Sequence, residues 1–184
     1  EARRVSAFSI YLALGIAALF SVGTGVFMHP ILELLGAGEN TYEYARQYAF
    51  CVIVLGGIPT VLSNVLSNLI RSIGRSREAS IGIVLGGLLN IALDPLFMFV
   101  LLPEGSEVLG AGIATCLSNC VALLFFVVVL LRIGRDSAVT FSPRAGLPSR
   151  ASVAAVFGVG VPSAVATLLF DLDYVIIDKL MVSY

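Results

Sequence analysis

The stretch GGLLNIALDPLFMFV, residues 86–100, places an asparagine, an aspartate and a proline inside an otherwise apolar run. A carboxylate at membrane depth is costly, and a proline removes one helical hydrogen bond. Asn90 and Asp94 are four residues apart, so they lie on one face of a helix, one turn from each other. Pro95 leaves the carbonyl of Ile91 without its helical N–H partner. Together these features predict a functional face inside a membrane helix.

The composition is that of a membrane protein. The 184 residues are 58% hydrophobic and only 12% charged, whereas soluble domains carry about 25% charged residues. The mean hydropathy is +1.00. A formal net charge of −1 gives no indication of a nucleic-acid partner. Because the sequence starts without a methionine and stops inside an apolar run, we expect it to be a segment of a longer protein.

Five apolar runs are long enough to cross a bilayer, whose core of ~30 Å needs about 20 helical residues. We therefore predict an all-α integral membrane protein, a polytopic helical bundle. Gly82 and Gly86 are spaced for close helix packing in the third run. The runs are 5–32, 47–70, 79–102, 108–131 and a fifth that begins near residue 151.

The basic residues predict the orientation of the bundle. Every arginine except Arg46 lies at the start of the chain, in the joint between the second and third runs, or in the joint between the fourth and fifth runs. In a bundle of five spans, these three segments share one side of the membrane. Cytoplasmic joints collect arginine and lysine, so residue 1 is expected on the cytoplasmic side of the cell inner (plasma) membrane. The arginines on this side are Arg3, Arg4, Arg71, Arg75, Arg77, Arg132, Arg135, Arg144 and Arg150.

The fourth run adds polar groups at similar depth. At 1.5 Å per residue, Asp94 lies about 12 Å below the outer end and Thr115 about 10 Å below it. Asn119, at about 16 Å, is expected nearly level with Asn90. A carboxylate with neutral oxygens suits H⁺ or Na⁺, and burial raises a carboxyl pKa toward neutrality. The alternative is a structural aspartate that ties two helices together.

Other polar residues and prolines give weaker signals. Asp171 and Asp173 could form a substrate or second cation site, or they could lie at a solvated helix end. Pro59, Pro95 and Pro162 predict helix bends of the kind that secondary transporters use, with simple packing kinks as the alternative.

The block GGLLNIALDPLFMFV, followed by GAGIATCLSN at residues 110–119, resembles the fifth and sixth helices of the multidrug and toxic compound extrusion (MATE) family. The segment 58–79, IPTVLSNVLSNLIRSIGRSREA, is similar to the family's fourth helix and the joint after it. Residues 28–48, MHPILELLGAGENTYEYARQY, resemble the end of the third helix and the outer loop. Residues 158–177, GVGVPSAVATLLFDLDYVII, resemble the seventh helix.

The resemblance implies a protein of twelve helices in two lobes. Residues 1–135 would hold helices three to six of the N-terminal lobe, 136–150 a cytoplasmic inter-lobe linker, and 151–184 the start of the C-terminal lobe. It also implies a secondary antiporter, not an enzyme, that needs no cofactor. Such a protein exports organic cations or other amphipathic drugs in exchange for H⁺ or Na⁺. Its partners would be these substrates, the lipid bilayer and the remaining helices of the full-length chain.

The same resemblance implies specific site residues. The family's cation site matches Asn90, Asp94 and Thr115, while its fourth member, an aspartate of the first helix, lies outside this sequence. Some branches carry an acid eight residues after the proline of the seventh helix. Here Phe170 occupies that position and Asp171 follows it, so the acid is displaced by one residue.

Three alternatives compete with a cation-coupled exporter. A lipid-linked saccharide flippase of the same superfamily would carry more basic residues in its cavity, where only Lys179 is a candidate. An intramembrane aspartyl protease would need two facing aspartates, and the sequence around Asp94 lacks the Gly-x-Gly-Asp pattern of such enzymes. A non-transporting membrane subunit is the third alternative.

Overall fold

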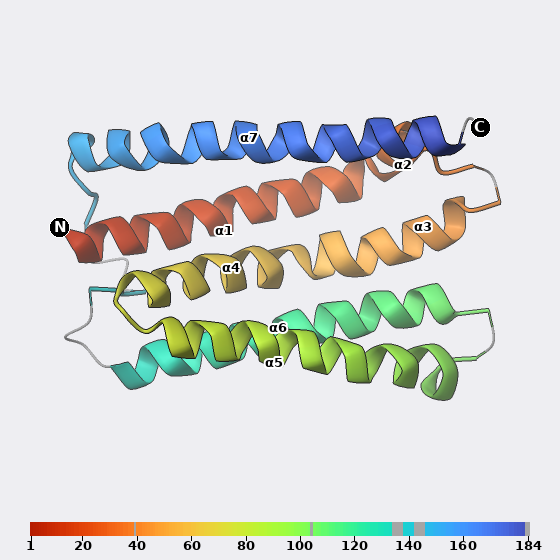
Figure 1. Cartoon of the computed structure of the whole chain (residues 1–184), viewed down its shortest axis with the longest axis horizontal. Coiled ribbons are helices and arrows are strands. Elements are labelled where there is room, and N and C mark those ends of the chain that lie inside the picture. Colours follow the sequence, from red (N-terminus) through yellow and green to blue (C-terminus); the bar gives the residue numbers. More distant parts are fainter. Residues whose placement is uncertain (39, 104, 134–137, 142–145, 183–184) are drawn as a thin grey trace.

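The computed structural model describes residues 1–38, 40–103, 105–133, 138–141 and 146–182, and within these residues every regular element is helical. Figure 1 shows long, roughly antiparallel helices joined at the two ends of a bundle. The fold class predicted from the apolar runs is therefore confirmed. The elements are α1 (Ala2–Val26), α2 (Met28–Leu34), α3 (Tyr42–Ala49), η1 (Phe50–Leu55), α4 (Gly57–Ser72), α5 (Ser76–Leu96), η2 (Phe97–Leu101), α6 (Glu107–Ile133) and α7 (Arg150–Val182).

The first apolar run divides into two helices, which corrects the single span expected over residues 5–32. Phe27 leaves the helical conformation with φ −102° and ψ 27°, and α2 follows it as a short helix. Pro30 lies in the first turn of α2, where its missing N–H leaves the carbonyl of Val26 without a helical donor. Within the first apolar run, only α1, Ala2–Val26, is therefore long enough to cross a membrane.

The second run forms a bent span. The helix of Tyr42–Leu55 and that of Gly57–Ser72 meet at 47°. The wide turns of η1 end where the N–H of Gly56 reaches back five residues to the carbonyl of Cys51, at 2.9 Å. A Cβ at Gly56 would lie 2.7 Å from the carbonyl oxygen of Val52, so only glycine fits this bend. Pro59 follows in the first turn of α4, where helical N–H groups have no partner in any case.

Pro95 and Pro162, the other two prolines at which helix bends were predicted, do not interrupt their helices. α5 continues through Pro95 to Leu96 and passes directly into the wide turns of η2. α7 runs from Arg150 to Val182 across Pro162. Among the described residues, α1, α5 with η2, α6 and α7 are each long and apolar enough to cross a bilayer, and the bent α3–α4 pair can supply a fifth crossing. The chain is a multi-pass membrane protein.

The core lies where α4, α5 and α6 meet. Phe126 of α6 is 1% exposed and packs with Leu66 and Ile70 of α4. A Cβ at Gly82 would lie 2.3 Å from the Phe126 ring, and one at Gly86 would lie 3.2 Å from Ala122. The small residues that the sequence placed on one face of this helix therefore let α5 approach α6 closely.

α7 stands apart from this core. Its side chains from residue 157 to residue 174 are exposed, among them Phe170 and Tyr174. Figure 1 shows α7 along the edge of the bundle, on the opposite side from α5 and α6. This apolar helix has lipid or further protein as its natural neighbour, because the described part of the chain leaves its surface uncovered.

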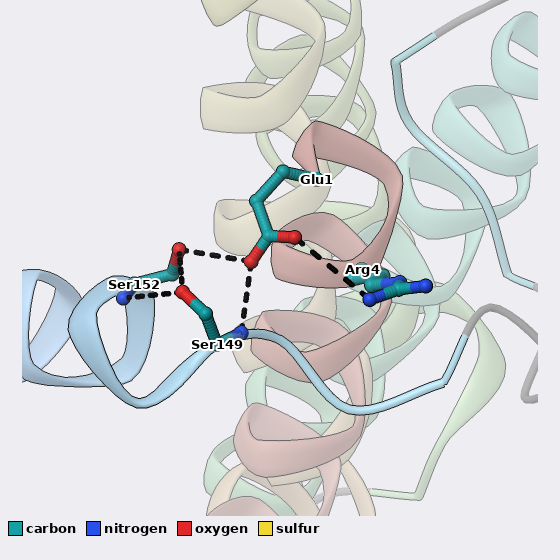
Figure 2. A network of polar contacts seen from close by, with 4 residues as sticks. All are labelled: Glu1, Arg4, Ser149 and Ser152. Carbon is teal, nitrogen blue, oxygen red and sulfur yellow. Dashed lines mark hydrogen bonds and ion pairs between the residues drawn. The ribbon is translucent and has the colours of Figure 1, made fainter.

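The segment before α7 is held on the first turns of α1. Figure 2 shows Glu1 accepting hydrogen bonds from the Ser149 backbone N–H at 2.8 Å and the Ser152 hydroxyl at 3.0 Å. The Ser149 hydroxyl accepts the N–H of Ser152 at 3.2 Å, which is the geometry of an N-cap. Further along, Tyr11 donates to the carbonyl of Phe141 at 2.7 Å. The predicted linker 136–150 is thus attached to α1 where it is described, while residues 134–137 and 142–145 lie outside the described structure.

Candidate functional site

The three residues expected to form a cation site are brought together between α5 and α6. The Asn90 carboxamide donates through Nδ2 to Asp94 Oδ1 at 3.0 Å and to Thr115 Oγ1 at 3.3 Å. All three residues are half-buried. One amide group therefore links the carboxylate of its own helix to the hydroxyl of the next.

The local sequence explains this geometry. Asn90 and Asp94 are one turn apart on α5, so their side chains can meet without distorting the helix. Pro95 adds a second feature, because its ring removes the N–H that the Ile91 carbonyl would otherwise accept. The site therefore offers a carboxylate, an amide, a hydroxyl and a backbone carbonyl within about one helical turn.

The cluster combines one carboxylate with neutral oxygen and amide groups. The oxygen groups of Asp94 and Thr115 suit small hard cations. Among the described ion pairs, none includes Asp94. The carboxylate charge of Asp94 is therefore not balanced by a basic side chain within the described ion pairs.

Asn119, which was expected nearly level with Asn90, forms its hydrogen bond to a different helix. Its Nδ2 donates to the Thr60 hydroxyl of α4 at 2.9 Å. Thr115 and Asn119 are four residues apart, and each residue of a helix turns by about 100°. The second side chain therefore points about 40° further round α6, which turns it from α5 toward α4.

A second group of polar residues surrounds this Asn119–Thr60 contact. These residues were not predicted as a site from the sequence. The Ser63 hydroxyl donates to the Asn119 carbonyl at 3.3 Å, and Asn64 donates to the Thr60 carbonyl at 3.0 Å. The signal was present in the sequence, because Thr60, Ser63, Asn64 and Ser67 follow the i, i+3, i+4, i+7 spacing of one helical face.

Asp171 and Asp173 do not join either group. Both are exposed on α7, and Figure 1 places that helix across the bundle from α5. An aspartyl dyad between Asp94 and either of these residues is therefore absent from the described chain. This arrangement does not support the intramembrane protease alternative.

Comparison with known proteins agrees with this architecture. The family model MatE matches residues 1–96. The multidrug export protein MepA of Staphylococcus haemolyticus is 28% identical over 180 residues, which are 98% of this chain and 38% of MepA. The Staphylococcus aureus MepA is 26% identical over 184 residues, 100% of this chain and 40% of that protein. The chain thus spans about two fifths of the length of these relatives.

Solved structures are similar as well. An outward-facing multidrug resistance MATE family transporter of the MOP superfamily matches with a TM-score of 0.81 and 31% identity, over 92% of this chain and 36% of that one. A MOP superfamily transporter from Pyrococcus furiosus matches with a TM-score of 0.78 and 32% identity, over 90% and 35% of the two chains. Because the family model covers more than half of the sequence and the helices superpose on solved transporters of this kind, the chain belongs to the MatE family.

Proposed function

We propose that this chain is part of a secondary antiporter that exports organic cations or other amphipathic drugs in exchange for H⁺ or Na⁺. Asp94 is its coupling residue, and Asn90 and Thr115 complete the site. The observation that carries the proposal is the double hydrogen bond of the Asn90 amide to the Asp94 carboxylate and the Thr115 hydroxyl. The MepA relatives, which are named multidrug export proteins, support the same class of activity.

The amide makes the site responsive to the charge on Asp94. With Asp94 ionised, Asn90 Nδ2 donates to a carboxylate, a charge-assisted bond. When Asp94 binds a proton, its O–H becomes a donor and the bond to Asn90 weakens. A sodium ion would instead take the oxygens of Asp94 and Thr115 as ligands. Either event alters the link between α5 and α6, so cation binding can favour one arrangement of these helices over another.

We propose the following organisation for the rest of the protein. Residues 1–135 form helices three to six of the N-terminal lobe, 136–150 the inter-lobe linker, and 151–184 the start of the C-terminal lobe. The uncovered surface of α7 suits a helix that packs within a second lobe outside this chain. The arginine distribution supports an inner-membrane protein with residue 1 in the cytoplasm.

The polar residues of the spans favour an exporter over a saccharide flippase. Those described at membrane depth are neutral or acidic, and they include Thr60, Asn64, Asn90, Asp94, Thr115 and Asn119. A cavity of this kind attracts cations more readily than phosphorylated lipids. Lys179, the one candidate base, has a side chain outside the described structure.

The test is the substitution Asp94→Asn in the full-length protein, reconstituted in proteoliposomes. The carboxamide keeps the size of the side chain and removes its ability to bind and release a proton. We expect drug export driven by a pH or Na⁺ gradient to fall at least a hundredfold, with an unchanged elution profile in detergent. Export at the wild-type rate would exclude Asp94 as the coupling residue.

A further inference from the structure

A cavity of about 120 Å³ with a mixed polar and apolar lining lies between α4, α5 and α6, and Asn90, Asp94 and Thr115 are not among its lining residues. A water molecule takes up about 30 Å³ in the liquid, so this space holds several waters. Two of its serines, Ser63 and Ser67, are 8% and 3% exposed, so it reaches into the bundle interior. The lining residues are Thr60, Ser63, Asn64 and Ser67 of α4, Ile83, Gly86 and Gly87 of α5, and Asn119, Ala122 and Phe126 of α6.

The polar groups of this cavity are rich in hydrogen-bond acceptors. Its three hydroxyl groups each donate their hydrogen to a backbone carbonyl: Thr60 to Gly56 at 2.7 Å, Ser63 to Asn119 at 3.3 Å and Ser67 to Asn64 at 2.9 Å. Their oxygen lone pairs are left for other partners.

The carboxamide side chains of Asn64 and Asn119 add further hydrogen-bond acceptors to the cavity. Asn119 and Asn64 use their Nδ2 groups on the hydroxyl and the carbonyl of Thr60. In the hydrogen bonds of the described residues, neither side-chain oxygen accepts a donor. A cavity that presents oxygen lone pairs and few hydrogens suits water and small cations, which bind through positive charge or donated hydrogens.

The position of the cavity along the bundle is the second observation. On α5, Gly86 lies one turn before Asn90, and on α6, Asn119 lies one turn after Thr115. On α4, Ser67 lies one turn before Arg71, which is exposed at the end of the bundle. One turn is about 5.4 Å. All three helices therefore place the cavity between the Asp94 cluster and the arginine-bearing end.

We propose that this cavity is a hydrated passage through which the coupling cation travels between Asp94 and the arginine-bearing side of the membrane. The inference rests on the proposed function. For H⁺, the O–H bond of neutral Asp94 breaks, the proton joins a cavity water as hydronium, and the carboxylate remains. For Na⁺, the ion exchanges the oxygens of the Asp94 cluster for water and the oxygens of Asn119 and Thr60, and no covalent bond changes.

Gly87 is an exposed residue of α5 that lines the cavity. A Cβ built at Gly87 meets no atom within 4 Å, although the residue lines the cavity. A larger side chain can therefore occupy the space without clashing with the helices. Val84, three residues earlier on α5, instead lines an apolar groove with Ile81 and Leu88 and has no part in the polar cavity. The two positions lie three residues apart on α5, about 4.5 Å along the helix axis, so they form a closely spaced pair.

The first experiment tests hydration directly with Ag⁺, a monovalent cation that binds thiolates. Gly87→Cys, Ser67→Cys and Val84→Cys are placed one at a time in a full-length protein whose other cysteines are replaced by alanine. Ag⁺ is applied on the arginine-bearing side of proteoliposomes. Mass spectrometry then measures how fast each cysteine becomes protected from later alkylation. Thiolates form in water and hardly at all in an apolar setting.

We expect protection of G87C and S67C at least tenfold faster than that of V84C. Equal, slow protection of all three cysteines would overturn the passage. This measurement needs no transport, so its failure is distinct from a failure of the coupling role, which is tested by Asp94→Asn.

The second experiment closes the passage. Gly87→Leu fills the cavity with an apolar side chain, and Val84→Leu adds similar bulk on the apolar groove. We expect G87L to lower drug export at least tenfold and V84L to stay within twofold of wild type, with both proteins folded by elution profile and thermal unfolding. Measuring export under a pH gradient and under a Na⁺ gradient separately identifies the ion that uses the passage. Wild-type export by G87L under both gradients would refute the proposal.

Discussion

The hydroxyl of Ser21 in α1 donates to the carbonyl of Ile53 in η1, at 3.0 Å. This contact lies just before the 47° bend of the second span, where the backbone leaves regular α-helical hydrogen bonding. A Cβ at Gly57 would lie 2.7 Å from the same hydroxyl oxygen, so a glycine makes room for it. The bend is therefore supported from the neighbouring helix as well as by its own glycines.

Ser21→Ala is expected to destabilise the folded protein by about 1 kcal/mol, the usual net value of a hydrogen bond. Ser21 is 4% exposed, so water cannot easily replace the lost donor. Thermal unfolding in detergent measures the change. Ser72→Ala is the control, because that exposed hydroxyl donates to Leu69 within its own helix. Equal effects of the two substitutions would count against a special role for Ser21.

Gly82→Ala is expected to destabilise the bundle by about 1–3 kcal/mol, the usual cost of overpacking a core. The added methyl would lie 2.3 Å from the ring of Phe126, which is 1% exposed and cannot move outward freely. Denaturant unfolding of the purified protein measures the loss. Gly15→Ala is the matched control, since a Cβ there meets nothing within 4 Å and alanine favours the helix. Phe126→Leu should restore part of the stability of G82A, and no rescue would argue against this contact.

Much of the fold follows from the sequence because membrane helices have a length set by the bilayer. The apolar runs identify the helices, and the spacing of Asn90 and Asp94 predicts that their side chains meet on one helical face, as they do. The break at Phe27 was not foreseen, because Pro30 lies so close to the end of the first run that the run reads as one helix. The bend at Gly56 depends on a close approach to Val52 that no residue pattern reveals.

The hydrogen-bond partners of Asn119 could not be predicted from the sequence either. Counting residues gives the depth of a side chain but not its direction around the helix axis relative to two neighbours. The direction decides whether Asn119 meets α5 or α4, and it depends on how α6 packs. The polar face of α4 can be predicted from Thr60 and Asn64, but the cavity beside it depends on how α4 packs against α5 and α6.

Asn90→Leu is expected to lower drug export more than Thr115→Ala does, because the Asn90 amide contacts both other members of the cluster. We expect a loss of at least thirtyfold for N90L and about threefold to tenfold for T115A, where a water can replace the hydroxyl. Initial rates of export in proteoliposomes measure both. The double variant should be scarcely worse than N90L, since the Asn90 amide holds the Thr115 hydroxyl in the cluster. Additive losses would place Thr115 in a separate role.

The contact between Glu1 and the start of α7 is expected to depend on pH. The Ser149 backbone N–H, followed by the Ser152 hydroxyl, lowers the pKa of the Glu1 carboxyl below its usual value. A lowered pKa means that the contact contributes fully above the ordinary glutamate pKa of about 4.3 and is lost as pH falls through the lower folded value. Hydrogen exchange of the Ser149 and Ser152 amides should therefore be faster in Glu1→Ala than in wild type at pH 7. Toward pH 3 the two rates should converge. Glu33→Ala, at the opposite end of α1 and α2, should leave both amides unchanged. A ratio of rates that stays constant from pH 7 to pH 3 would mean that the carboxylate charge does not hold the start of α7.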